Sequence, residues 1–176
     1  MKNYRTMAGP AMLALLVAVS LVIPNALKAA DSPEIMKLLA DAKAEAAELK
    51  VDSGQLESFT RSTMTWRGYA SKLDEIKVHI NNTGKLLGKL KAAETTGSPW
   101  QQAAIKRIEP LLKELADNTT ATINHLNDNP GKIHTPAFTD YVKANSELAT
   151  DLEAVIRDFV DYGRDKEQFE SLGSKL

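Results

Sequence analysis

The stretch SPWQQAAIKRIEPLLKELADNTTATINHLND, residues 98–128, decides the fold class of this chain. Serine followed by proline marks a helix start, because serine can accept a hydrogen bond from a free amide and proline at the first helical position needs no donor. Gln101 stands at capping-box spacing from Ser98. Small or apolar residues then recur every three or four positions, which predicts one buried helix face. They are Ala104, Ile108, Leu111, Leu115, Thr122 and Leu126.

The same start signal occurs at Asp31-Ser32-Pro33 and at His134-Thr135-Pro136. A fourth start is expected near Asp52-Ser53-Gly54, where Asp52 and Gln55 have capping-box spacing. These signals predict four helices, over residues 33–51, 54–94, 99–128 and 136–172. The first is rich in alanine, which predicts a close approach of a neighbouring helix. Its apolar positions are Ile35, Leu38, Leu39, Ala42, Ala46 and Leu49.

Two of the other expected helices carry long apolar stripes that include most of the aromatic residues. The stripe expected on residues 54–94 is Phe59, Trp66, Tyr69, Leu73, Ile76, Ile80, Leu87 and Leu90. The stripe expected on residues 136–172 is Phe138, Tyr141, Leu148, Leu152, Val155, Phe159, Tyr162 and Phe169. Gly84 and Gly88, four residues apart, mark either a close helix crossing or local flexibility.

The chain is therefore expected to be all-α. Short connections make neighbouring helices antiparallel. We predict an up-down antiparallel helical bundle of three long helices and one shorter N-terminal helix, with coiled-coil-like packing, forming a single domain over residues 30–176. Trp100, in the first turn of its helix, is expected either to cover the end of the bundle or to meet a partner.

Residues 1–29 have the layout of a secretory signal peptide. Lys2 and Arg5 precede an apolar run of 13 residues, Ala11–Ile23, and small residues surround a junction at Ala29-Ala30. The alternative is an uncleaved N-terminal anchor, because 22 residues without charge separate Arg5 from Lys28. The expected location is periplasmic or secreted, or at the inner membrane if the anchor is kept.

Composition excludes several classes of function. The three bases of residues 1–29 aside, 19 basic and 23 acidic residues leave a net charge of −4, which gives no reason to bind nucleic acid. A membrane contact is expected only through an uncleaved N-terminal segment. The chain has no cysteine, which excludes disulfides, thiolate metal sites and cysteine nucleophiles.

The stretch HLNDNPGKIHTP, residues 125–136, allows two interpretations. Asn129-Pro130-Gly131 suits a β-turn with Gly131 at positive φ, and Thr135 would cap the next helix. The weaker alternative is a metal site formed by His125, Asp128 and His134. It lacks the paired-histidine spacing that fixes two imidazoles on one helix face.

No cofactor is expected. Met36 is placed like the haem methionine of small exported bundles, but no histidine follows His134 to supply the second axial ligand. The Glu-x-x-His pairs of di-iron bundles, nucleophile motifs and phosphate-binding loops are absent from the sequence. The charged residues fit solvated helix faces, so an enzyme is not expected.

The runs SPWQQAAIKRIEPLLKELADNTTATINHLNDN and YVKANSELATDLEAVIRDFVDYG resemble small exported bacterial helical-bundle proteins without assigned activity. The resemblance implies export and a helical fold. We therefore expect an exported, non-enzymatic bundle that acts as a structural or interaction module at the cell envelope, through an unknown protein partner or by self-association. The alternative is an exported bundle that binds a small ligand or a metal.

Overall fold

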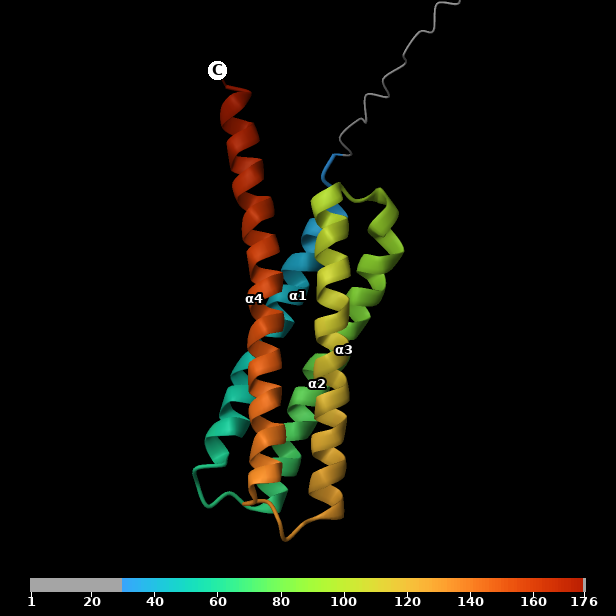
Figure 1. Cartoon of the computed structure of the whole chain (residues 1–176). Helices are drawn as coiled ribbons and strands as arrows, with labels where there is room; N and C mark the ends of the chain where they lie inside the picture. Colours follow the sequence, from blue (N-terminus) through green and yellow to red (C-terminus); the bar gives the residue numbers. More distant parts are fainter. Residues whose placement is uncertain (1–29, 176) are drawn as a thin grey trace, which may run out of the picture.

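The computed structural model describes residues 30–175, and the predicted signal peptide lies outside them. Four long helices account for most of this part, and no strand occurs within it, so the all-α prediction is confirmed (Figure 1). The elements are α1 (Pro33–Phe59), α2 (Trp66–Ala93), the 3₁₀ turn η1 (Glu94–Thr96), α3 (Pro99–Asp128) and α4 (Pro136–Gly173).

Three helices begin where the serine-proline and threonine-proline signals predicted. Ser32 caps α1 by accepting from the Ile35 amide at 3.4 Å. At α3, the Gln101 side chain accepts from the Ser98 amide at 3.0 Å, which is the return half of the predicted capping box. Thr135 differs, because its hydroxyl donates to the Lys132 carbonyl at 2.8 Å and caps no amide of α4.

The predicted boundary at residues 52–54 is wrong, since α1 continues through it to Phe59. Ser53 and Leu56 are fully buried there. Burial of this turn therefore outweighs the roughly 1 kcal/mol by which Gly54 disfavours a helix. Residues 60–65 form the connection, and Thr65 caps α2 by accepting from the Gly68 amide at 3.3 Å. The first helix thus has 27 residues and is not a short one.

Hydrogen bonds between helix ends show how the helices lie. The Gln101 side chain at the start of α3 bonds to both backbone groups of Ser32 at the start of α1. At the opposite end, the Trp66 indole at the start of α2 donates to the carbonyl of Leu126, near the end of α3, at 3.0 Å. Helix α1 packs against α2 and α4, and α3 packs against the same two helices. Helix α4 extends past the others at the end where residue 30 lies (Figure 1).

The core contains the stripe predicted for the first helix, whose six residues are all buried. The stripe predicted for the fourth helix is partly wrong. Tyr162 and Phe169 are exposed, and Val155 is only partly buried. The buried side of α4 combines large apolar residues with small and polar ones. The buried residues of α4 are Phe138, Val142, Asn145, Ala149, Leu152, Glu153, Ile156 and Gly163.

Asn145 is buried because α3 supplies partners for its amide. Its oxygen accepts from the Thr119 hydroxyl at 2.7 Å, and its nitrogen donates to the Thr122 hydroxyl at 2.8 Å. A buried polar group is tolerated when its hydrogen bonds are made, and such a pair fixes the register of two helices. Asn145 therefore aligns α3 with α4.

The connection between α3 and α4 is a turn, as one interpretation predicted. The Lys132 amide donates to the Asn129 carbonyl at 2.9 Å across Pro130 and Gly131. Gly131 does not have the predicted positive φ. The turn instead keeps both central residues at negative φ, which needs no glycine.

Candidate functional site

The three residues proposed as a metal site do not come together as a ligand group. His125 lies against the rings of Phe138 and Tyr141, at centroid distances of 6.0 and 5.4 Å. Asp128 and His134 are exposed. Across residues 30–175 no three histidine or acidic side chains are grouped so that they could hold a metal ion. His125 is therefore part of the aromatic packing at the end of the bundle where Tyr69 meets Phe138.

The remaining histidine, His79 on α2, lies between two carboxylates of α1. Its Nδ1 is 2.8 Å from the Glu45 carboxylate, and its Nε2 is 3.5 Å from that of Asp52. Asp52 also accepts from Lys72, whose pKa is raised by hydrogen bonds from its ammonium group to Glu75 and then to Asp52. Sequence analysis missed this cluster. Its signal was the seven-residue spacing of Glu45 and Asp52, and of Lys72 and His79, which places each pair on one helix face.

A second polar cluster joins α1 to α4. Glu153 was expected on a solvated face, but it is only 7% exposed. Its carboxylate accepts from Lys50 at 2.9 Å and from Arg157 at 3.0 Å. Two cations thus compensate the burial of one anion, as a buried charge requires. Together with the His79 cluster, this arrangement fixes α1 between its neighbours.

Trp100 covers the end of the bundle where the described chain begins. Its indole donates to Asp31 at 2.7 Å, and its ring lies edge-on to Tyr162 at 5.3 Å. Gly163 lets it approach, since a Cβ there would lie 2.7 Å from the Trp100 ring. Of the two roles expected for Trp100, these contacts correspond to covering the end of the bundle.

The charges at this end reinforce the contact. Partial burial acts to raise the pKa of Asp31, but hydrogen bonds from Lys166, Ser98 and Trp100 outweigh it and leave that pKa lowered. The pKa of Lys166 is raised by its hydrogen bonds to Asp31 and Glu170. Asp31, the second residue after the predicted cleavage junction, is thus held in place by α3 and α4.

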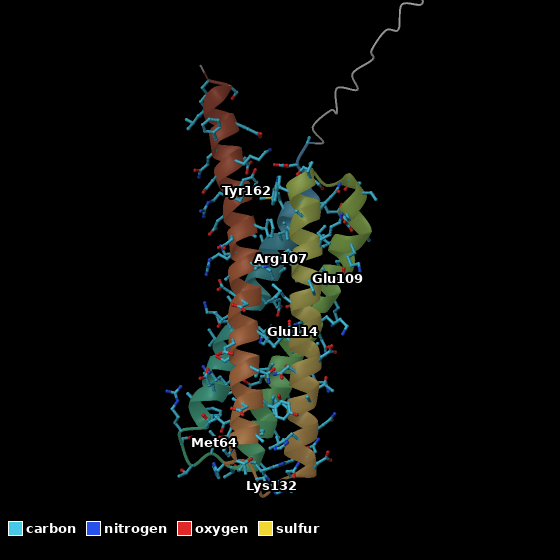
Figure 2. The ribbon with its side chains drawn as sticks, in the orientation of Figure 1. Met64, Arg107, Glu109, Glu114, Lys132 and Tyr162 are labelled. Carbon is cyan, nitrogen blue, oxygen red and sulfur yellow. The ribbon has the colours of Figure 1, made fainter. Side chains whose placement is uncertain are left out.

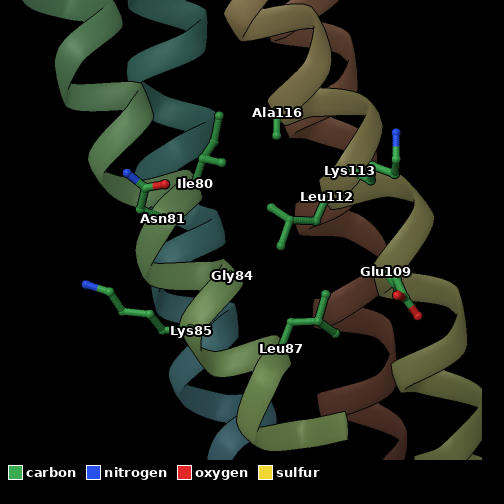
Figure 3. Close-up of a pocket in the computed structure, with 9 residues that line it drawn as sticks. All are labelled: Ile80, Asn81, Gly84, Lys85, Leu87, Glu109, Leu112, Lys113 and Ala116. Carbon is green, nitrogen blue, oxygen red and sulfur yellow. The ribbon is translucent and has the colours of Figure 1, made fainter.

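An open groove separates α2 from α3, as Figure 3 shows. One part of the groove has a volume of about 700 Å³, and an adjoining part of about 410 Å³ shares Ile80, Asn81 and Ala116 with it. Leu87 and Leu112 point into the space between the helices, while Lys85 and Lys113 extend outward on either side (Figure 3). The groove therefore has an apolar floor and charged edges.

Gly84 makes the groove deeper on the side of α2. It lies inside the helix, and a Cβ built on it would have no atom within 4 Å. The same holds for Gly88, so neither glycine marks a close crossing within the described chain. A glycine inside a helix costs about 1 kcal/mol relative to alanine. No contact within residues 30–175 explains that cost at Gly84.

Comparisons with protein families, curated proteins and solved structures found no match to this chain. The resemblance to small exported bacterial bundles thus stays a prediction. Within the described residues, no helix has the length and apolar character needed to cross a bilayer.

Proposed function

We propose that this protein is an exported, non-enzymatic, up-down antiparallel helical bundle that acts as an interaction module at the cell envelope. The groove between α2 and α3 is its binding surface. Export rests on the basic start, the apolar run and the small residues of positions 1–30.

The observation that carries the proposal is Gly84 at the open groove. Apolar side chains such as Leu87 and Leu112 line the floor, and a glycine that no internal contact requires keeps it clear. Two of the three histidines make contacts that join parts of the bundle. His79 links two helices through carboxylates, and His125 packs between aromatic rings. Helical grooves of this kind bind amphipathic helices in other proteins.

A photocrosslinking experiment tests the proposal. A photoreactive amino acid replaces Asn81 at the groove, and a matched variant carries it at Glu48, an exposed position on α1. The chain is expressed in a bacterium, and its fractionation and N-terminus are determined. We expect an extracytoplasmic chain that begins near Ala30 and forms a discrete adduct from position 81 but not from 48. A chain retained in the cytoplasm, or no adduct from position 81, would contradict the proposal.

Small-ligand binding is a second candidate function, favoured by one feature. A recess of about 530 Å³ between α3 and α4 is lined by Ala103, Val155, Phe159 and Tyr162, with Arg107 and Asp158 among its lining residues. Figure 2 places Arg107 on α3 facing the side where α4 carries Tyr162. Native mass spectrometry of the purified chain tests this function, because a retained ligand adds a defined mass. A spectrum with the bare chain mass alone counts against it.

A further inference from the structure

The edge of the groove on the side of α2 carries a row of lysines. Lys77, Asn81, Lys85 and Lys89 follow one another at four-residue intervals, so they lie on one face of α2. Lys77, Asn81 and Lys85 line the groove, and Lys89 lies one turn further along the same face. Residues 77–93 contain four lysines and no acid, whereas residues 30–176 as a whole have a net charge of −4. A positive stretch of an acidic chain thus borders the groove.

The lysines of this row have no internal partner for their charge. Lys77, Lys85 and Lys89 are exposed, and no ion pair among residues 30–175 includes them. Like charges four residues apart destabilise a helix, and Lys85 and Lys89 have that spacing. Nothing in the described chain offsets this repulsion. The row is therefore placed to pair with acids that come from outside the chain.

The edge on the side of α3 differs, because its charges are already paired. Lys113 bonds to Asp117, four residues further along α3. Glu109 accepts from Lys91 at the end of α2. Thr120, which continues this edge, is uncharged. An occupant of the groove therefore meets unpaired positive charge on one side only, that of α2.

The apolar floor lies below these edges. Ile80, Leu87 and Leu112 keep only 8, 9 and 6% of their surface exposed. Leu87 and Leu112 point into the space between the two helices (Figure 3). A bilayer surface receives apolar side chains that project from a protein, and these do not project. A helix is narrow enough to place one apolar face in such a groove, so the shape favours a helix over a membrane as the occupant.

The groove also sets the size of that helix. From Glu109 to Asn124 the groove follows 15 residues of α3, or about 22 Å at the helical rise, which is about four turns. Lys77 and Lys85 are eight residues apart, or about 12 Å, so they face acids about two turns apart on a helix that runs along α2. Gly84, beside Lys85, leaves room for one large apolar side chain of the occupant.

We propose that the α2–α3 groove binds an acidic amphipathic helix of a partner protein. The inference rests on the proposed function and states the chemistry of the partner of the same groove. The apolar face of the partner helix lies on the floor and fills the space at Gly84. Glutamate or aspartate side chains on one flank of that helix pair with Lys77, Lys85 and Lys89. Because like charges repel at this edge, the same lysines exclude a basic helix.

Two fluorescent peptides of about 15 residues, the length of the groove, test the proposal. Both are held helical by a side-chain staple and carry leucine along one face. One has glutamate on one flank, and the other has lysine at the same positions. Fluorescence anisotropy with the processed chain should show binding of the glutamate peptide at low salt, with an affinity that falls as salt rises. The lysine peptide should bind at least roughly tenfold more weakly.

Variants of the protein separate the charge of the edge from the space at the floor. The double variant Lys77→Glu, Lys85→Glu should bind the glutamate peptide roughly tenfold more weakly and should gain affinity for the lysine peptide. Gly84→Leu, which fills the groove, should also weaken binding of the glutamate peptide. Lys37→Glu is the matched control, because Lys37 is an exposed lysine of α1 that no ion pair within residues 30–175 includes. It should bind like the wild type, and circular dichroism should show the same helix content in all variants.

Three results would overturn the inference. The first is equal binding of the two peptides, and the second is a double variant that binds the glutamate peptide as the wild type does. The third comes from vesicles of phosphatidylglycerol. A wild type that sediments with these vesicles, while the double variant stays in solution, would identify a lipid surface as the partner. A discrete adduct from position 81 together with equal binding of the two peptides would overturn this inference and leave the proposed function intact.

Discussion

The seam between α1 and α4 and the seam between α2 and α3 are built from similar amphipathic helices, yet one is closed and the other open. At the closed seam, small residues such as Ala46 and Ala149 are fully buried. Ion pairs cross it, with Lys50 on Glu153 and Lys43 on Asp161 at 2.9 and 3.0 Å. The Lys43 hydrogen bond lowers the pKa of Asp161, against a smaller opposing effect of burial.

At the open seam, a Cβ on Gly84 would contact no neighbour. Only two ion pairs are recorded across this seam, Lys91 with Glu109 and Lys106 with Glu94, and both lie toward the end where α2 stops. In this molecule, small residues allow close helix packing where the opposite helix also presents small residues or forms ion pairs with the first helix. At Gly84 the opposite helix does neither, and a groove remains.

The largest effects are expected for core residues of the closed seam. Leu152→Ala should lower the free energy of unfolding by about 2–4 kcal/mol, because the substitution truncates a fully buried side chain and leaves a cavity. Val155→Ala, at a position of α4 that lines the recess with α3, should lower the free energy of unfolding by about 1 kcal/mol or less, since Val155 is only partly buried. Urea titrations of both variants measure the difference. Equal losses would show that the assigned burial of α4 is wrong.

The second-largest loss of stability is expected when the buried carboxylate of Glu153 at the closed seam is removed. Glu153→Ala leaves Lys50 and Arg157 without their shared partner at a site that is 7% exposed. We expect a loss of about 1–3 kcal/mol. Glu109→Ala at the open seam removes a carboxylate that is about half exposed and should cost under about 1 kcal/mol. Thermal unfolding of the two variants at matched salt provides the measurement, and a greater loss for Glu109→Ala would reverse the comparison.

Replacing each of two helical glycines by alanine should change the free energy of unfolding in opposite directions. Gly163→Ala places a Cβ 2.7 Å from the Trp100 ring and 2.8 Å from Met36, which should cost about 1–3 kcal/mol. Gly84→Ala meets nothing within 4 Å and should stabilise the monomer by about 0.4–1 kcal/mol. Denaturation at low protein concentration isolates the monomer. A destabilising Gly84→Ala would mean that the groove is not open.

A smaller change in stability is expected from Asp31, at the end of the bundle that Trp100 covers, and it should appear as a dependence on pH. The pKa of Asp31 is lower in the folded chain than its usual value near 3.8. Such a carboxylate contributes stability above the unfolded pKa, and this contribution is lost as pH falls through the folded pKa. Stability of the wild type should therefore decline more steeply than that of Asp31→Asn below about pH 4. Identical slopes in melting temperature against pH would show that Asp31 is not held as described.

The smallest effects are expected in the loop between α3 and α4. Thr135 caps no amide of α4, and His134 is exposed. Thr135→Ala and His134→Ala should therefore each change stability by under about 0.5 kcal/mol. Gly131→Ala should be equally mild, because Gly131 does not have positive φ. Calorimetry of the three variants with and without zinc measures the effects. A zinc-dependent rise in melting temperature that His134→Ala abolishes would restore the metal interpretation.

The sequence by itself determined the features that depend on neighbouring residues. Serine before proline set the starts of α1 and α3, because the N-cap residue and the proline after it act within one helical turn. At α4, where the Thr135 side chain caps no amide, the proline at the first position marks the start. The three-and-four spacing of apolar residues predicted the buried face of α1 and much of that of α2, where the apolar stripe is narrow and unambiguous.

Tertiary structure decided what depends on the neighbouring helix. Burial of Ser53 and Leu56 carried α1 past an apparent stop at Gly54. The face of α4 was too broad for its pattern to specify the buried side, and contact with the alanines of α1 and the threonines of α3 selected it. The position of His79 between two carboxylates, and the groove at Gly84, arise from the distance between helices. No local pattern encodes that distance, because it is set by the side chains that both helices bring to the seam.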